Sequence, residues 1–207
     1  MSEGMEGSLR IIKLGGSLLD WDRLQSVLTC WLGEQPPALD VLVTGGGRLA
    51  DQLRAYDQVH KLDPTTVHLA AAMTMSITAR LVAGLLGDPK IVTRLDEFSQ
   101  ADRSLGCVVF DPYVFLTDEQ PWGGGAGLPH GWQVTSDSIA ARLAEVTGAD
   151  ELVLLKSALP RQGATWSDVA RQGLVDDYFP IAVQRVGQVR YVNLRDPAAG
   201  AWRPLSV

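Results

Sequence analysis

The chain contains a short apolar run closed by three consecutive glycines, Asp40-Val-Leu-Val-Thr-Gly-Gly-Gly-Arg48. An uninterrupted apolar run of this length is typical of a strand that is buried on both faces of a parallel sheet. A similar unit precedes it, Arg10-Ile-Ile-Lys-Leu-Gly-Gly-Ser17, in which an apolar strand ends on two glycines. Helix-like patterns follow both units, so this part of the chain predicts an α/β fold.

The rest of the chain continues the alternation of helices and strands. Apolar residues at helical spacing predict a helix over 24–32. Asp63 and Pro64 form a typical helix start and Gly87 a typical stop, so a long helix is expected over 64–86. We expect further strands at 91–93, 107–110, 151–155 and 189–193, helices at 48–57, 135–147 and 167–171, and a loop at 119–131. The pattern predicts a parallel sheet with helices on both faces.

Length and composition narrow the class of protein. The 207 residues are 46% hydrophobic and 20% charged, which is ordinary for one soluble domain, so we expect a single domain over 1–207 with a flexible start at 1–8. The net charge of −6 argues against nucleic-acid or anionic-membrane partners, because both need a basic patch. The start is not a signal peptide, and the apolar stretch 67–86 contains Arg80 and suits a buried helix. We therefore expect a cytoplasmic protein with no nucleic-acid and no membrane partner.

The first candidate site is Lys13-Leu-Gly-Gly-Ser17, where a predicted strand ends and a helix begins soon after. Exposed backbone N–H groups in such a turn can cradle an anion, and Lys13 adds a positive charge. Ligands of open α/β sheets gather at the carboxyl ends of strands. Taken alone, the pattern is explained at least as well by a plain turn with a solvated lysine.

The second candidate site is the triple glycine Gly45-Gly46-Gly47, which allows a ligand to approach the backbone closely. The spacing Gly45-x-Gly47-x-x-Ala50 also fits a loose dinucleotide fingerprint, which is a rival interpretation. That interpretation needs an acid at the end of the next strand, and Asp63, near the right spacing, has the features of a helix cap. The stretch is not a P-loop, because no Gly-Lys-Ser/Thr follows the glycines.

Two further stretches place polar residues at the ends of predicted elements. Thr135-Ser136-Asp137 crowds a helix start, where simple capping is a sufficient explanation. The strand 151–155 ends abruptly on Lys156 and Ser157. Lys156 is either an ordinary exposed strand end or a second cation aimed at phosphate.

The order and spacing of these four stretches resemble the amino acid kinase family. The resemblance runs from about Arg10 to Pro180, and the segment 173–180 is similar to a late loop that lies near the nucleotide in that family. It implies a three-layer α/β/α sandwich around a mainly parallel sheet. It also implies transfer of the γ-phosphoryl group of ATP to a carboxylate, carbamate or phosphate oxygen of a small anionic substrate, and assembly into a homo-oligomer.

The resemblance also implies roles for individual residues. By position, Lys13 matches the lysine that contacts the transferring phosphoryl group, and Lys156 the lysine that neutralises the nucleotide phosphates. Asp137 matches the acid that positions both lysines. The nucleotide site would further include Gly15, Gly16, Ser17, Thr135, Ser136 and Ser157, and the acceptor site Gly45, Gly46, Gly47, Arg48 and His130. The alternatives are a solvent-facing helix position for Arg48 and a structural role for His130.

The implied cofactors are ATP and Mg²⁺. Mg²⁺ would bridge the ATP phosphates, and phosphate oxygens and water would be its main ligands. The sequence shows no carboxylate cluster dedicated to the metal, so no protein ligand is assigned to it. An anionic acceptor oxygen needs no general base.

The form of one stretch, Pro129-His-Gly-Trp-Gln-Val-Thr-Ser-Asp-Ser-Ile-Ala140, resembles one branch of the family, the aminomethylfuran phosphate kinases of methanofuran biosynthesis. That branch converts a phosphate monoester to a diphosphate. The chain departs from larger members in lacking room for a long substrate-lid hairpin between the second strand and the long helix.

Two other functions are consistent with the same sequence. One is a protein that binds ATP without turnover, such as a sensor or a storage subunit of the same fold. The other is a dinucleotide-binding oxidoreductase that uses Gly45 to Ala50, although this leaves Lys13 and Lys156 without a role.

Overall fold

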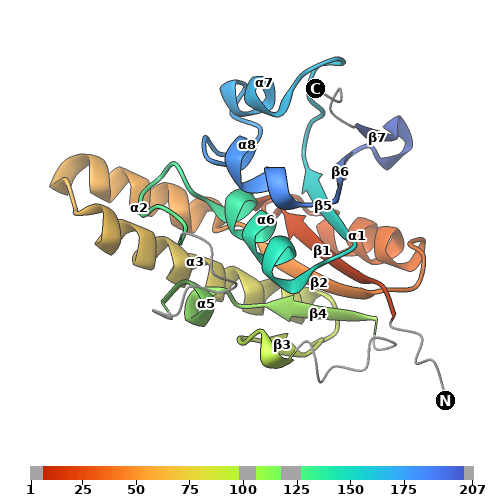
Figure 1. Cartoon of the computed structure of the whole chain (residues 1–207). Coiled ribbons are helices and arrows are strands. Elements are labelled where there is room, and N and C mark those ends of the chain that lie inside the picture. Colours follow the sequence, from red (N-terminus) through yellow and green to blue (C-terminus); the bar gives the residue numbers. More distant parts are fainter. Residues whose placement is uncertain (1–6, 98–105, 118–126, 203–207) are drawn as a thin grey trace.

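The computed structural model of the chain describes residues 7–97, 106–117 and 127–202, and its centre is one twisted sheet (Figure 1). In the described part the sheet has seven strands in the order β3-β4-β2-β1-β5-β6-β7. Six of them are parallel, and only β7 runs antiparallel to its neighbour β6. The strands are β1 (Leu9–Leu14), β2 (Leu39–Thr44), β3 (Ile91–Val92), β4 (Cys107–Phe110), β5 (Glu151–Lys156), β6 (Gln188–Asn193) and β7 (Ala201–Trp202).

The apolar runs of the sequence become the central strands. Every residue of β1 and of β2 is buried, as expected for strands covered on both faces. Strand β1 lies between β2 and β5, with Lys13 opposite Val43 on one side and Leu154 on the other. The parallel sheet that the sequence predicted is confirmed.

Helices cover the two faces of the sheet and make the fold a three-layer sandwich (Figure 1). One face packs against α1 (Leu24–Gly33) and the second half of α3 (Pro64–Leu85). The other face packs against α6 (Ser136–Thr147), α7 (Trp166–Arg171) and α8 (Phe179–Ala182). This confirms the predicted three-layer α/β/α architecture.

Helix α2 (Gly47–His60) does not cover the sheet. It buries none of its residues fully and lies beside α3, and the two helices extend together away from the sheet (Figure 1). The long helix begins and ends as predicted. The Asp63 carboxylate accepts hydrogen bonds from the backbone N–H groups of Thr65 and Thr66 at 3.1 and 3.0 Å, and Gly87 follows the helix with a φ of 82°.

Some elements differ from the sequence-based expectations. Helix α2 continues to His60 because Lys61, in the left-handed conformation, ends it. Helix α5 (Tyr113–Thr117), α8 and β7 were not predicted, because elements of two to five residues are too short to show a period. The described residues also form the 3₁₀ turns η1 (Gly16–Leu18), η3 (Val183–Arg185) and η4 (Pro197–Ala199). Most of the loop expected at 119–131 lies outside the described residues.

Helix α3 is the one helix in the described part that is long and apolar enough to span a membrane by length and composition. Its inner face carries Ala79, Val82 and Ala83, which are fully buried against the sheet. Its outer face exposes Met73, Ile77 and Leu81. The helix is therefore a core element on one side and an exposed apolar surface on the other.

Candidate functional site

The candidate site lies where the carboxyl ends of β2, β1 and β5 meet. These three strands are neighbours and parallel, so the segments that follow them emerge at the same edge of the sheet. The N-terminus of α6 reaches the same edge from the face that α6 covers, because α6 packs against β1. The topology thus brings together four stretches that are far apart in the sequence.

Two lysines share one carboxylate at the centre of this site. The Nζ atoms of Lys13 and Lys156 lie 2.7 and 2.8 Å from Oδ1 of Asp137, and Lys156 also donates to Oδ2 at 2.8 Å. Lys13 of β1 lies opposite Leu154 of β5, and Lys156 is two residues after Leu154 in the same strand. Because side chains alternate between the faces of a sheet, both lysine side chains point to the face that α6 covers. We call these three residues the lysine–aspartate cluster.

The cluster is deeply buried and electrostatically unbalanced. Burial alone would raise the pKa of Asp137, but the charges of Lys13 and Lys156 outweigh it and lower the pKa to about 2. Burial and the charge of Lys13 lower the pKa of Lys156 to about 7, against the attraction of Asp137. With both lysines protonated, the cluster has one positive charge more than it has negative charge. It can therefore accept an anion without adding a buried unpaired charge.

The two glycine loops form one surface beside the cluster. The backbone N–H of Gly15 donates to the carbonyl of Leu155, and that of Gly45 to the carbonyl of Leu14, which ties the loops to the strand ends. The loops also touch each other, because a Cβ on Gly16 would lie 2.6 Å from the backbone nitrogen of Gly47. Only glycine fits this contact. The first N–H groups of α2, which starts at Gly47, have no partner within the helix.

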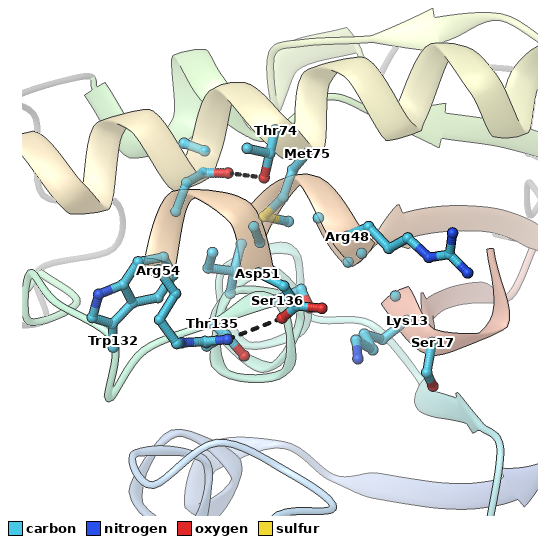
Figure 2. A pocket seen from close by; sticks show the side chains of 18 of the residues that line it. Lys13, Ser17, Arg48, Asp51, Arg54, Thr74, Met75, Trp132, Thr135 and Ser136 are labelled. Atoms are coloured by element: carbon cyan, nitrogen blue, oxygen red, sulfur yellow. Dashed lines mark hydrogen bonds and ion pairs between the residues drawn. The ribbon is translucent and has the colours of Figure 1, made fainter. Parts of the chain in front are cut away.

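A cavity of about 510 Å³ opens between these loops, α2, α3 and the segment before α6. Figure 2 shows Lys13 and Ser17 at one end of it and Trp132 with Arg54 at the other. The predicted residues that line the cavity are Lys13, Gly16, Ser17, Gly45, Gly46, Gly47, Arg48, Thr135 and Ser136. Ser157 is tied to this site by the contact between its hydroxyl and that of Ser17 at 3.1 Å.

Two predicted acceptor residues lie in unexpected surroundings. Arg48 stands at the rim of the cavity, with its side chain 80% exposed and paired to Asp20 at 2.9 Å. His130 is not among the residues that line the cavity. Its ring stacks on that of His68 at 4.7 Å, and its Nδ1 lies 2.9 Å from the hydroxyl of Thr65. His68, which does line the cavity, was not singled out from the sequence.

Sequence reasoning also missed the carboxylate that caps α6. The Asp176 side chain accepts from the backbone N–H groups of Thr135 and Ser138 at 2.8 and 3.0 Å, from both of their hydroxyls, and from the N–H of Phe179. The segment 173–180 was expected near the nucleotide, but nothing local distinguishes Asp176 from Asp177. The same segment also fixes Lys156, whose Nζ donates to the carbonyl of Leu174 at 2.6 Å.

The outer wall of the cavity was missed as well. The indole N–H of Trp132 donates to Asp57 at 2.9 Å, and the guanidinium of Arg54 lies 4.3 Å from the centre of the Trp132 ring. These contacts join the segment before α6 to α2. They close the cavity at the end opposite to Lys13.

Two further features of the structure concern a metal ion and a dinucleotide, the two other ligands considered from the sequence. No group of three or more His, Cys, Asp or Glu side chains that could hold a metal ion occurs within residues 7–97, 106–117 and 127–202. A dinucleotide site would need an acid at the end of a strand after α2. The chain instead passes from α2 directly into α3, where Asp63 caps the helix.

Comparisons with known proteins match the chain to one family model and to solved structures of the same fold. The model of the family described as "Amino acid kinase family" matches residues 8–158. UMP kinase from Ureaplasma parvum superimposes with a TM-score of 0.66 at 14% identity, covering 93% of this chain and 90% of that one. UMP kinase from Bacillus anthracis gives 0.61 at 15% identity, covering 93% and 90%. Carbamate kinase from Giardia lamblia bound to AMP-PNP gives 0.54 at 13% identity, covering 94% and 95%. No curated protein sequence matches.

Proposed function

Because this chain belongs to the amino acid kinase family, we propose that it is a small-molecule kinase that transfers the γ-phosphoryl group of ATP to an anionic oxygen. The observation that carries the proposal is the lysine–aspartate cluster, in which two lysines share one carboxylate, beside two glycine loops whose backbone no side chain covers. Such a site suits a group whose negative charge is spread over several oxygens. The likeness to UMP and carbamate kinases supports the same class of reaction.

In this reaction the protein mainly has to position the two reactants and to provide positive charge that stabilises the transition state. The bond between the γ-phosphorus and the ADP oxygen breaks, and a new bond forms to the anionic acceptor oxygen, which has no proton to lose. Lys13 and Lys156 would stabilise the charge on the transferring and leaving oxygens. Asp137 would hold both ammonium groups in place, since each lies within 2.8 Å of its carboxylate.

The glycine loops would provide the uncharged part of the site. Gly15, Gly16 and Ser17 would bind phosphate oxygens of the nucleotide together with Thr135, Ser136 and Ser157, and Gly45 to Gly47 would hold the acceptor. Mg²⁺ would be held by phosphate oxygens and water and would neutralise phosphate charge. Asp137, the carboxylate of the cluster, is already shared by the two lysines and is therefore not assigned to the metal.

We further propose a phosphate monoester as the acceptor, with a diphosphate as the product. The resemblance of residues 129–140 to the aminomethylfuran phosphate kinases suggests aminomethylfuran phosphate as the specific compound. The cavity of about 510 Å³ supports an acceptor of this size.

The test measures ADP release from MgATP with aminomethylfuran phosphate, simple phosphate monoesters and short carboxylates as acceptors. Lys13→Ala and Lys156→Ala should each lower turnover about 10²–10³-fold, which is typical for the loss of one group that stabilises transition-state charge. Lys90→Ala is the matched control, because Lys90 is exposed, lies outside the site and pairs with Glu97 at 3.1 Å. It should leave turnover unchanged.

The result can also favour one of the alternative functions. Full activity in either cluster mutant would refute the assignment of the cluster. Tight MgATP binding with no ADP release on any acceptor would favour an ATP-binding protein without turnover. Binding of NADH, unaffected by ATP, would favour the dinucleotide interpretation.

A further inference from the structure

The cavity continues past the glycine loops along the inner face of α3. His68, Ala72 and Met75 follow one another at helical spacing on this face, and all three are buried and line the cavity. Val134 and Ile139, also buried, line it from the side of α6. We call this section, between His68 and Met75, the α3 chamber. Apolar side chains form its walls on the sides of α3 and Val134, and polar residues such as Asp51, Arg54 and Thr135 line the same cavity.

Contacts of the glycine loops fix the length of the chamber. The hydroxyl of Thr44 contacts the carbonyl of Met75 at 3.4 Å, and a Cβ on Gly46 would collide with the hydroxyl of Thr74. The glycine loops therefore lie level with residues 74–75 of α3. His68 is seven residues before Met75, which corresponds to about 10 Å along a helix that rises 1.5 Å per residue. A ligand anchored at the glycine loops reaches His68 if it is about that long.

His68 closes the far end with an imidazole that has an unused hydrogen-bonding capacity. The residue is only 4% exposed, and its ring stacks on His130. Among the described residues its ring nitrogens have no hydrogen-bond partner, whereas those of its neighbours Trp132 and His130 contact Asp57 and Thr65. A ring nitrogen without a protein partner at the wall of a cavity is free to bind a ligand or a water.

The His68 ring is neutral in this position. Burial and the neighbouring His130 lower its pKa to about 4. A neutral imidazole offers one N–H donor and one nitrogen acceptor, and it adds no charge to the chamber. It can therefore bind either a hydrogen-bond donor or an acceptor of the ligand.

We propose that His68 is a specificity-determining residue that binds the far end of the phosphoryl acceptor. The acceptor is then a small phosphate or carboxylate with an apolar body and a hydrogen-bonding group about 10 Å from its anionic end. This inference rests on the proposed function, because it takes the glycine loops as the site of the reacting group. Nucleoside monophosphates are disfavoured, since on the side of Ala72 and Met75 the ribose hydroxyls would be buried against apolar side chains at a cost in free energy.

Calorimetric binding of three probes tests the proposal. 4-(Hydroxymethyl)benzyl phosphate and 4-methylbenzyl phosphate differ by one hydroxyl at the far end, and UMP has a polar body. Wild type should bind the hydroxymethyl compound about tenfold more tightly than the methyl compound, and UMP most weakly; tenfold is typical of one good hydrogen bond. His68→Leu should bind the two benzyl phosphates equally. His60→Leu, at the exposed end of α2, is the matched control and should keep the difference.

A second variant tests the chamber independently of His68. Ala72→Leu narrows the chamber and should weaken both benzyl phosphates at least tenfold, while inorganic phosphate, which needs only the glycine loops, should bind as it does to wild type. A tenfold preference that survives in His68→Leu would overturn the proposal. UMP binding as tight as that of the benzyl phosphates, or an Ala72→Leu protein with unchanged affinities, would overturn it as well.

A separate MgATP titration reports on the kinase assignment. If MgATP does not bind but His68→Leu removes the preference, the kinase assignment fails and the subsite stands.

Discussion

Single side chains in the lysine–aspartate cluster have unequal effects on stability. Among the residues that the structure describes, Asp137 is the only carboxylate that contacts the two buried ammonium groups of the cluster, while each lysine is one of two. Removing the shared carboxylate leaves two buried lysines without a counter-charge, so one of them must lose its proton or stay unpaired. Removing one lysine leaves a balanced pair.

Asp137→Asn should therefore destabilise the unliganded protein by about 3–5 kcal/mol, which is typical for breaking a buried ion pair from one side. Lys156→Met should cost roughly 1 kcal/mol, mainly from the unpaired carbonyl of Leu174. Urea unfolding at pH 7 measures both values. Equal losses in the two variants would show that the charge imbalance has no energetic consequence.

The lowered pKa of Lys156, about 7, makes nucleotide binding depend on pH. At pH 8 this side chain is largely neutral in the free protein, and a bound phosphate raises its pKa because the anion favours the charged form. We expect uptake of close to one proton on MgATP binding at pH 8 and little uptake at pH 6, where the lysine is already protonated. Calorimetry in buffers of different ionisation enthalpy measures the uptake.

Lys156→Met, which has no ionisable group at this position, should show no proton uptake at either pH. Uptake of the same size in this variant would assign the proton to another residue.

The glycine loops act as a pair of elements rather than as separate turns. A Cβ on Gly16 would lie 2.6 Å from the nitrogen of Gly47, and a Cβ on Gly45 would lie 2.7 Å from the nitrogen of Gly16. Both contacts are with backbone, which cannot rotate away. The two loops are therefore held in one arrangement by the absence of side chains.

Gly16→Ala should push the loops apart, cost about 1–3 kcal/mol of stability and lower turnover at least tenfold. Gly33→Ala is the control, because a Cβ there meets nothing within 4 Å at the end of α1. This change should be neutral or slightly stabilising. Thermal unfolding and ADP release measure the two effects, and retention of activity in Gly16→Ala would argue against close packing of the loops.

The segment between α7 and α8 holds the start of α6 through Asp176. Asp176→Ala leaves the backbone N–H groups of Thr135 and Ser138 without their acceptor, so it should cost about 1–3 kcal/mol. Because Asp137 lies in the same helical turn, kcat should fall more than KM rises. Asp176→Asn, which keeps an acceptor oxygen, should restore part of the activity.

Asp177→Ala is the matched control for this capping contact, since the neighbouring side chain is exposed. It should leave both stability and kcat close to those of wild type. An equal effect at both positions would mean that the segment matters only through its general packing.

At the scale of the whole molecule, the described residues form two apolar cores that share one sheet. Leu28 of α1 belongs to one core and Leu143 of α6 to the other, and both are buried. Since the same strands contribute side chains to both cores, neither can come apart without exposing the other. The single domain that the sequence predicted should therefore unfold as one unit.

Leu28→Ala and Leu143→Ala should each lower the free energy of unfolding by about 2–5 kcal/mol while the protein keeps one transition. Circular dichroism and tryptophan fluorescence should report the same midpoint. Leu81→Ala, on the exposed face of α3, should have a much smaller effect. Two separate midpoints in either core variant would show that the layers unfold independently.

Much of the fold is readable from the sequence because its signals are local. The apolar run of 40–44 indicates a buried strand, Asp63 with Pro64 indicates a helix start, and Gly87 indicates its end; the structure confirms all three. Each of these signals depends on a few neighbouring residues and on the steric and hydrogen-bonding rules of the backbone. Elements as short as α8 carry too few residues for such a signal.

The sequence by itself determined the alternation of strands and helices, the two glycine loops and the presence of Lys13, Asp137 and Lys156 at the ends of elements. Only the tertiary structure decided that these three charges share one buried contact, that Asp176 caps α6 and that His68 faces the cavity. The physical reason is that burial and pairing arise between residues far apart in the chain. The contribution of a charged group or an imidazole to stability and binding depends on its partners in space, and a local sequence pattern does not show which residues these are.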